Sequence, residues 1–177
     1  MQLFIDCETT GLSAIKNDLI TVTLGSKLHG YNTFFMKPEG EIEERALEVN
    51  GFTRSEIEAF PNKNIAREDF LAVLEECNTK ITPIGHNYQF DMQFLIKFLG
   101  EENYNKFFDR RYLDTMIIAK FYDELFNVGI ESFSLIGLCE KFDLVHLNAH
   151  SSYGDVMATE RLYYKLKELF KNVCTGN

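Results

Sequence analysis

Met1-Gln-Leu-Phe-Ile-Asp-Cys-Glu-Thr-Thr-Gly-Leu12 opens the chain, and its residues 2–8 alternate as a β-strand does. Side chains two residues apart in a strand share a face, so Asp6 and Glu8 should lie side by side, whereas Leu3, Ile5 and Cys7 should point the other way, into apolar packing. Two adjacent carboxylates repel each other unless a cation lies between them or they share a proton. Mg²⁺ is the simplest such cation, because it prefers hard oxygen ligands. An equally good interpretation of this segment alone is a strand that ends in solvent, with both acids exposed.

Length and composition indicate a globular protein with one domain, spanning residues 1–177. Hydrophobic residues make up 45% of the chain and charged residues 25%, as in ordinary globular proteins. No apolar run approaches the ~18 residues of a membrane-spanning helix, and the N-terminus lacks the features of a signal peptide, so we expect a cytoplasmic protein that contacts no membrane. The cysteines form no C-x-x-C pair and are expected to be reduced thiols; they are Cys7, Cys77, Cys139 and Cys174.

The net charge of -9 excludes a long basic surface of the kind that sequence-specific DNA-binding proteins use. It does not exclude a small nucleic-acid site, because two bound cations would add about four positive charges where a phosphate must lie. We therefore expect weak affinity for polynucleotide alone and distributive action.

The pattern of elements predicts an α/β fold. Three strands joined by short links, at 2–8, 18–27 and 31–37, imply antiparallel pairing. Helices and two further short strands then alternate, which gives a mixed five-stranded sheet of three antiparallel and two short parallel strands flanked by helices. The later strands are expected at 81–85 and 112–113, and the helices at 43–49, from Thr53, at 64–77, 90–99, 114–126, 134–142 and 153–173, the last capped by Ser152.

Two of these helices carry an acid at the head of the apolar stripe that should face the sheet, Asp91 and Asp155. A charge there is costly unless it is paired. If Asp91 and Asp155 reach the same place as Asp6 and Glu8, shared cations can neutralise all four carboxylates. Two Mg²⁺ or Mn²⁺ ions about 4 Å apart would neutralise the group and promote in-line attack of water on a phosphodiester. Alternatively, each helical acid only interacts with the dipole or cap of its own helix.

His150 lies five residues before Asp155, in the loop that leads to the last helix. A neutral imidazole near a metal-activated water can take its proton, so His150 is a candidate general base. The alternative is an ordinary histidine of a surface loop. His29 and His146 have no comparable context, and we expect both to be structural or surface residues.

Three segments occur in an order that is typical of one enzyme family. Asp6-Cys-Glu-Thr-Thr-Gly11 is similar to D-x-E-T-T-G, His86-Asn-Tyr-Gln-Phe-Asp91 to H-N-x-x-F-D, and His150-Ser-Ser-Tyr-Gly-Asp155 to H-x4-D. Over nearly its whole length the chain therefore resembles the DnaQ-like DEDDh family of 3′-5′ exonucleases. Tyr112-Leu-Asp-Thr115 also looks like a segment of this family, whereas the tyrosine variant of the third motif is not matched, because Ser151 stands at the tyrosine position.

The resemblance implies an RNase H-like fold and hydrolysis of 3′-terminal nucleotides to 5′-monophosphates. By the same resemblance, Asp6, Glu8 and Asp155 would bind the first metal ion, and Asp6 would bridge to the second. Asp91 would hold the second ion through water, and His150 would be the general base. Asn50 stands where the family segment V-H-G-I-T has histidine, which changes a contact to the terminal nucleotide. The expected substrate contacts are Thr9, Thr10, Gly11, Leu12, Val49, Asn50, Asn87 and Phe90.

The leading hypothesis is a metal-dependent 3′-5′ exonuclease that acts on single-stranded or frayed DNA. A ribonuclease of the same fold is the nearest alternative, and the choice depends on the room for a 2′-hydroxyl near residues 9–12 and Val49. A second alternative is a non-catalytic module that binds a DNA polymerase or another replication protein. A metal phosphatase for small molecules is a third, without a distinct signature in the sequence.

Overall fold

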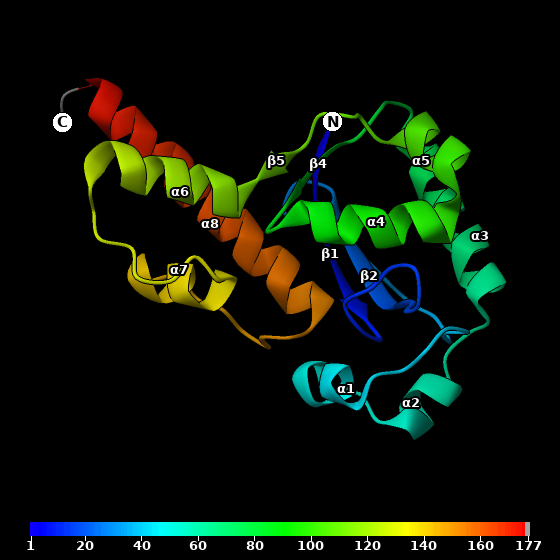
Figure 1. Ribbon diagram of the computed structural model, residues 1–177. Coiled ribbons are helices and arrows are strands. Elements are labelled where there is room, and N and C mark those ends of the chain that lie inside the picture. Colours follow the sequence, from blue (N-terminus) through cyan, green and yellow to red (C-terminus); the bar gives the residue numbers. More distant parts are fainter. Residues whose placement is uncertain (176–177) are drawn as a thin grey trace.

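The computed structural model describes residues 1–175, and a five-stranded β-sheet lies at its centre (Figure 1). The strand order is β3-β2-β1-β4-β5, with antiparallel pairing among the first three strands and parallel pairing of β4 with β1 and β5. This arrangement confirms the mixed sheet predicted from the sequence. The strands are β1 (Gln2–Thr9), β2 (Leu19–Ser26), β3 (Gly30–Phe35), β4 (Thr82–Gly85) and β5 (Leu113–Asp114).

The helices agree with the predicted ones to within a few residues, with one omission. Helix α5 was not predicted, because its seven residues contain only Tyr104 and Phe107 as buried positions, too few to show a period. Among the described residues, no helix combines the length and apolarity that crossing a membrane requires. The helices are α1 (Glu44–Asn50), α2 (Arg54–Glu58), α3 (Lys63–Glu76), α4 (Tyr88–Leu99), α5 (Glu101–Phe107), α6 (Thr115–Phe126), α7 (Leu135–Lys141) and α8 (Ser152–Thr175).

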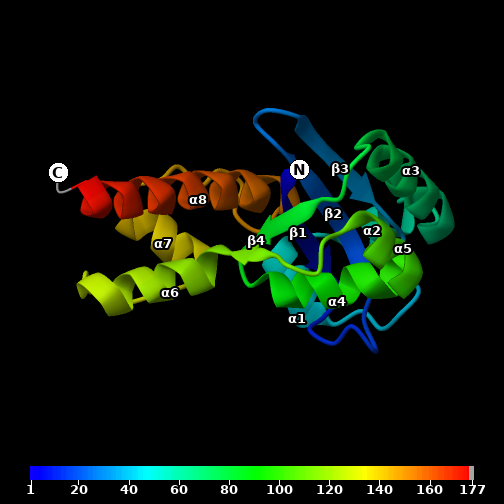
Figure 2. The ribbon, with the colours of Figure 1, turned by 90° about the horizontal axis from the view of Figure 1, so that it is seen from above.

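Strand β1 divides the core into two parts (Figure 2). Leu3 and Ile5 pack with aromatic residues of α3 and α4, whereas Phe4 packs on the opposite face against Val156 and Tyr163 of α8. This division follows from the alternation of side chains along a strand. Each face of β1 is therefore covered by a helix that carries one of the predicted acids.

Helices α6, α7 and α8 share a further apolar cluster beside the sheet, which contains Ala119, Leu138 and Leu162 (Figure 2). The cluster fixes α7 against α8 and so constrains the loop that joins them, residues 142–151. The expected thiol state of Cys174 concerns a side chain outside the described part of the chain, whereas Cys7, Cys77 and Cys139 are free thiols.

Candidate active site

Hydrogen bonds between hydroxyl groups hold the first turn of α8 against β2. Thr21 and Thr23 lie directly opposite the two acids of β1, so their side chains share a face with those acids. The buried Ser152 hydroxyl lies 2.9 Å from the Oγ1 of Thr21 and 2.8 Å from that of Thr23. Ser152 therefore anchors the helix, and the prediction that it caps the helix was wrong. The capping role falls to Ser151, whose Oγ accepts a hydrogen bond from the Gly154 N–H at 3.2 Å.

Three carboxylates meet where this anchored turn crosses β1. Ligand oxygens of Asp6, Glu8 and Asp155 all lie within 4.8 Å of one another. Burial, and then the neighbouring carboxylates of Asp91, Asp155 and Glu8, raise the pKa of Asp6 well above its usual value. Burial, followed by the charges of Asp155 and Asp91, raises the pKa of Glu8 to about 8. A half-buried set of three carboxylate oxygens fits a hard divalent cation such as Mg²⁺ or Mn²⁺.

Asp91, the fourth acid of the predicted group, is not among the three whose oxygens lie this close together. It is 3% exposed in the first turn of α4, and its carboxylate is hydrogen-bonded to the Cys7 thiol. Burial raises the pKa of Asp91, while the hydrogen bonds from Cys7 and the backbone oppose that rise. Cys7, expected to take part in apolar packing alone, therefore also has a polar contact. Asp91 remains close enough for its charge to raise the pKa values of Asp6 and Glu8.

Two histidines border the carboxylates. His150 is exposed, adopts a left-handed backbone with φ 64°, and lines a hollow of about 220 Å³ together with Asp6 and Asp155. His146 lines the same hollow, and its Nε2 lies 2.5 Å from the Oδ1 of Asp155. His146 was expected to be a structural or surface residue; its side chain is largely buried, and its contact with Asp155 was not predicted. The sequence position of His146 does not indicate its contact with Asp155, because that contact depends on the path of the loop backbone.

A second cavity, of about 560 Å³, adjoins Glu8 on the side of α1. Leu12 and Val49 are exposed at this cavity, where their apolar side chains could contact a base. Arg45 of α1 supplies a basic side chain to the same lining. The predicted substrate contacts that the structure brings together here are Thr9, Gly11, Leu12, Val49, Asn50 and Phe90.

Two features keep α1 close to the end of β1. The Asn50 amide donates to the Thr9 carbonyl at 3.2 Å, and its side-chain oxygen accepts the Phe52 N–H at 3.2 Å. The Glu43 N–H, one residue before α1, donates to the Thr10 carbonyl at 2.8 Å, and a Cβ on Gly11 in the same turn would lie 2.4 Å from the Nδ2 of Asn17. Asn50 thus ties two elements of the cavity together.

Two predicted substrate contacts lie outside the lining of this cavity. The Thr10 side chain is fully buried, donates to the Glu41 carbonyl at 2.6 Å and accepts the Asp18 N–H at 3.0 Å, so it shapes the turn and does not reach a ligand. Asn87 is exposed at the start of α4, and its backbone N–H donates to Asp114 at 3.1 Å. Asp114 also accepts hydrogen bonds from the first turn of α6 and therefore orients both helices.

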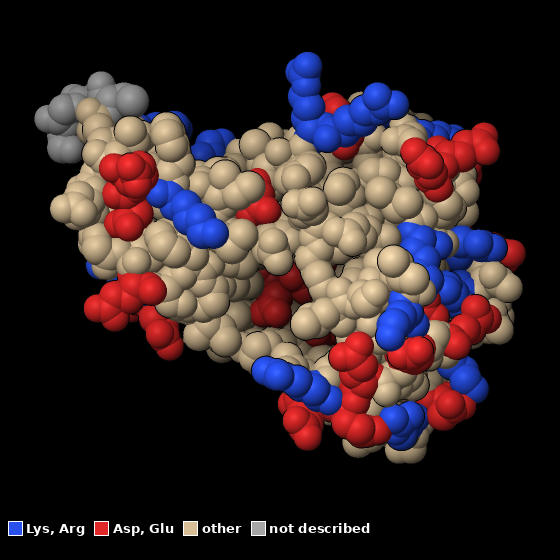
Figure 3. Space-filling view, in the orientation of Figure 1, with Lys and Arg blue, Asp and Glu red and all other residues tan. Residues whose placement is uncertain are grey.

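Figure 3 shows acidic side chains at the bottom of a hollow near the middle of one face, surrounded mainly by uncharged residues. Most of the lysine and arginine side chains that are visible lie away from it.

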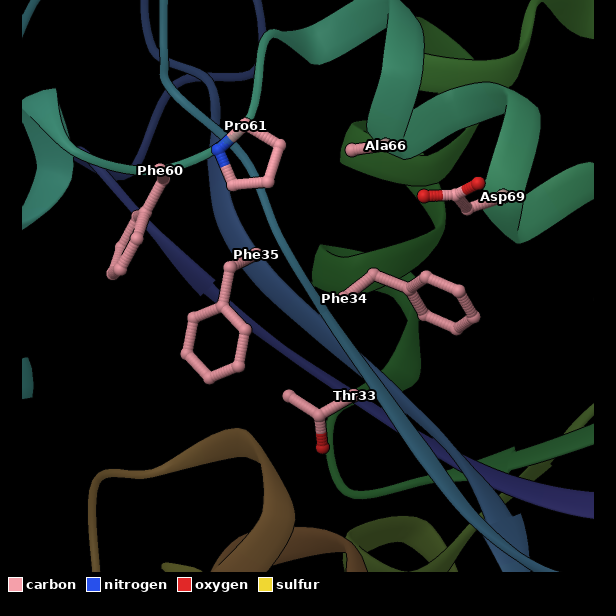
Figure 4. A pocket seen from close by; sticks show the side chains of 7 residues that line it. All are labelled: Thr33, Phe34, Phe35, Phe60, Pro61, Ala66 and Asp69. Carbon is pink, nitrogen blue, oxygen red and sulfur yellow. The ribbon is translucent and has the colours of Figure 1, made fainter.

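Figure 4 shows a different cavity, of about 350 Å³, between the aromatic side chains of β3 and Phe60, with Asp69 at its edge. The lining of this cavity offers one carboxylate, that of Asp69, whereas the hollow described above has both Asp6 and Asp155. The hollow is therefore the better candidate for a metal site and for catalysis.

Comparison with known proteins gives the family. The RNase T family model, described as "Exonuclease", matches residues 3–163. The chain belongs to this exonuclease family. Membership of the DnaQ-like group, within the RNase H-like superfamily, is thereby confirmed.

The exonuclease has curated relatives that are much longer. It is 29% identical to the DNA polymerase III PolC-type of Thermotoga petrophila, over 96% of this chain and 12% of that protein. The DNA polymerase III PolC-type of Lactococcus lactis is 28% identical, over 97% of this chain and 10% of that protein. The exonuclease thus spans about a tenth of the length of these relatives.

Solved structures show the same fold. E. coli exonuclease I in complex with a dT13 oligonucleotide matches with a TM-score of 0.73 and 20% identity, over 98% of this chain and 43% of that chain. The zinc-bound complex of E. coli exonuclease I with single-stranded DNA matches with a TM-score of 0.77 and 21% identity, over 98% of this chain and 42% of that chain. At such identities the likeness shows a shared architecture.

Proposed function

We propose that this exonuclease removes 3′-terminal nucleotides from single-stranded or frayed DNA as 5′-monophosphates, with two Mg²⁺ or Mn²⁺ ions as cofactors. The observation that carries the proposal is the group of three carboxylates, Asp6, Glu8 and Asp155, within 4.8 Å of one another. The raised pKa of Glu8 indicates that the group needs a cation to become fully ionised. The resemblance of the three motifs to DEDDh enzymes supports the 3′-5′ direction.

Each residue of the site has a proposed role. Asp6, Glu8 and Asp155 would hold one cation, and Asp91, which approaches from the side of α4, would help to hold the second. When bound, the cations supply a lowered pKa for the attacking water and positive charge beside the phosphate. His150 takes the proton of that water on a ring nitrogen, and its exposed position beside Asp6 and Asp155 places the imidazole where a substrate can reach it.

The cavity beside Glu8 is the proposed site of the terminal nucleotide. Its volume of about 560 Å³ and the apolar side chains of Leu12, Val49 and Phe90 suit a base and its sugar. Two kinds of relative favour DNA as substrate. The solved exonuclease I structures hold DNA oligonucleotides, and the curated relatives are named DNA polymerases. A DNA polymerase or another replication protein is therefore the proposed protein partner.

A time course on a 5′-labelled oligonucleotide tests the proposal. Matched single strands of DNA and RNA are incubated with Mg²⁺, with Mn²⁺ and with EDTA, and Asp6→Asn serves as the inactive control. A ladder that shortens from the 3′ end only with metal, and faster on DNA, is the expected result. Immediate release of the labelled 5′ nucleotide would overturn the polarity, and no cleavage of either strand would favour a non-catalytic module.

An exoribonuclease is the second candidate, because the matching family model carries the name of a ribonuclease, RNase T. The same chemistry serves both substrates, and the difference lies in the room for a 2′-hydroxyl near Leu12 and Val49. Faster shortening of the RNA strand in the same time course would select this candidate.

A further inference from the structure

The loop between α7 and α8 turns the side chain of His146 inward, between two exposed neighbours. The His146 side chain is 9% exposed, whereas its neighbours Val145 and Leu147 are 57% and 63% exposed. The His146 Nε2 lies 2.5 Å from the Oδ1 of Asp155, whose side chain is 15% exposed. The loop thus leaves two apolar residues in solvent and buries an imidazole against a proposed cation ligand.

Two contacts with α8 fix the loop on either side of His146. Before it, Arg161 donates an Nη1–H to the Val145 carbonyl at 2.8 Å. After it, a Cβ on Gly154 would lie 2.4 Å from the carbonyl oxygen of Leu147 and 2.5 Å from that of Asn148. The loop backbone therefore rests directly on the first turn of α8, at a place where glycine provides the space.

The hydrogen-bond pattern assigns the direction of the contact. The Nδ1 of His146 is buried and has no hydrogen-bond partner among the described residues. A neutral imidazole that carries its hydrogen on Nε2 leaves only an acceptor at Nδ1, whereas hydrogen at Nδ1 would leave a buried donor unpaired. Nε2 therefore donates to the Asp155 carboxylate.

We propose that His146 is a positioning residue, whose Nε2–H holds one oxygen of Asp155 so that the other oxygen is directed at the cation shared with Asp6 and Glu8. The inference rests on the proposed function, since it concerns the same cation site. Groups that orient a ligand carboxylate in this way contribute to metal affinity although they do not touch the metal. The two histidines of the loop thus have separate tasks, because His150 acts on the substrate side and His146 acts through Asp155.

Titration calorimetry with Mn²⁺ alone tests the proposal. His146→Ala should weaken Mn²⁺ binding by about 10- to 100-fold, as the loss of such a partner typically does. His146→Gln should recover most of the affinity, because its amide nitrogen can take the place of Nε2, whereas the shorter side chain of His146→Asn should not. His29→Ala, in the exposed turn between β2 and β3, is the matched control and should bind as the wild type does.

Cleavage assays at increasing Mn²⁺ separate the two histidines. His146→Ala should need a correspondingly higher Mn²⁺ concentration for half-maximal rate and approach the wild-type rate at saturation. His150→Ala should keep the wild-type Mn²⁺ dependence and lose maximal rate. If His146→Ala lost rate without any change in Mn²⁺ dependence, the positioning role would be overturned.

Two further results would also overturn the inference: wild-type Mn²⁺ affinity in His146→Ala, or equal affinities of the Gln and Asn variants. If His146→Ala does not fold by circular dichroism, the Gln and Asn variants decide. Gly154→Ala then gives a second route, because displacement of the loop should weaken Mn²⁺ binding with His146 still present. A wild type that binds Mn²⁺ but cleaves no nucleic acid would refute the proposed function alone, since the affinities still test His146.

Discussion

Glu8→Gln should stabilise the metal-free protein at neutral and alkaline pH, although it removes a proposed cation ligand. Burial and the charges of Asp155 and Asp91 raise the pKa of Glu8 from 4.5 to about 8. Between these values the native state holds a proton that the unfolded chain has released. The free energy of unfolding therefore falls as the pH rises from about 4.5 to about 8, and below this window the contribution is absent.

The magnitude follows from the two pKa values of Glu8. The difference between 4.5 and about 8 corresponds to about 5 kcal/mol at pH values above the window, and to about 3 kcal/mol at pH 7. Glutamine has nearly the shape of the protonated acid and carries no charge at any pH, so it avoids this cost. For a chain of this length, about 3 kcal/mol corresponds to a rise in Tm of roughly 10 °C.

Thermal unfolding in EDTA, followed by circular dichroism from pH 5 to pH 9, measures this effect. The Tm of the wild type should fall through the window, and the Tm difference from Glu8→Gln should shrink to a few degrees at pH 5. Glu124→Gln, an exposed change on α6, is the matched control and should follow the wild type. Added Mg²⁺ should raise the Tm of the wild type more than that of Glu8→Gln, because ligand binding stabilises the native state. The reasoning is refuted if Glu8→Gln at pH 8 without metal unfolds at or below the temperature of the wild type.

Three other changes test the same site. His150→Ala should lower kcat by about 10²- to 10⁴-fold with little change in Tm, and an unaltered kcat would reject its role as base. Asp6→Asn should abolish metal-dependent cleavage and raise the Tm in EDTA, because a buried carboxylate with a raised pKa is removed; a lower Tm would contradict this. Ser152→Ala should reduce the free energy of unfolding by about 1–3 kcal/mol in urea titrations, since it leaves the buried hydroxyl of Thr21 without its partner, while Thr23 keeps its contact with Thr33; no loss would show that the anchor is dispensable.

Local patterns predict the sheet and the adjacent pair of acids on β1. Asp6 and Glu8 share a face because strand side chains alternate, and Thr21 and Thr23 follow the same rule on the neighbouring strand. The capping box that starts α2 at Thr53 is also local and is present as predicted. Each of these features depends on residues within a few positions of one another or on the regular register of paired strands.

Features that depend on irregular backbone were not predictable in this way. His146 reaches Asp155 through a loop in which Asn148 and His150 adopt left-handed conformations, with φ 53° and 64°. Left-handed residues change the direction of the chain without a periodic trace in the sequence. Asp91 is a different case, because its place in the first turn of α4 was predicted, whereas its partner Cys7 was assigned to apolar packing alone.

The proposed dependence of the site on cations follows from the division of the core by β1. Asp6 and Glu8 face α8 and meet Asp155, whereas Asp91 approaches from the side of α4, where Cys7 packs. The fold thus brings four acids near one strand end, in a chain of net charge -9, where their charges add to burial in raising the pKa values of Asp6 and Glu8. A nucleic-acid phosphate carries the same sign of charge as this hollow (Figure 3), so repulsion opposes its entry until the carboxylates are neutralised. Cation binding must therefore accompany or precede productive binding of the substrate.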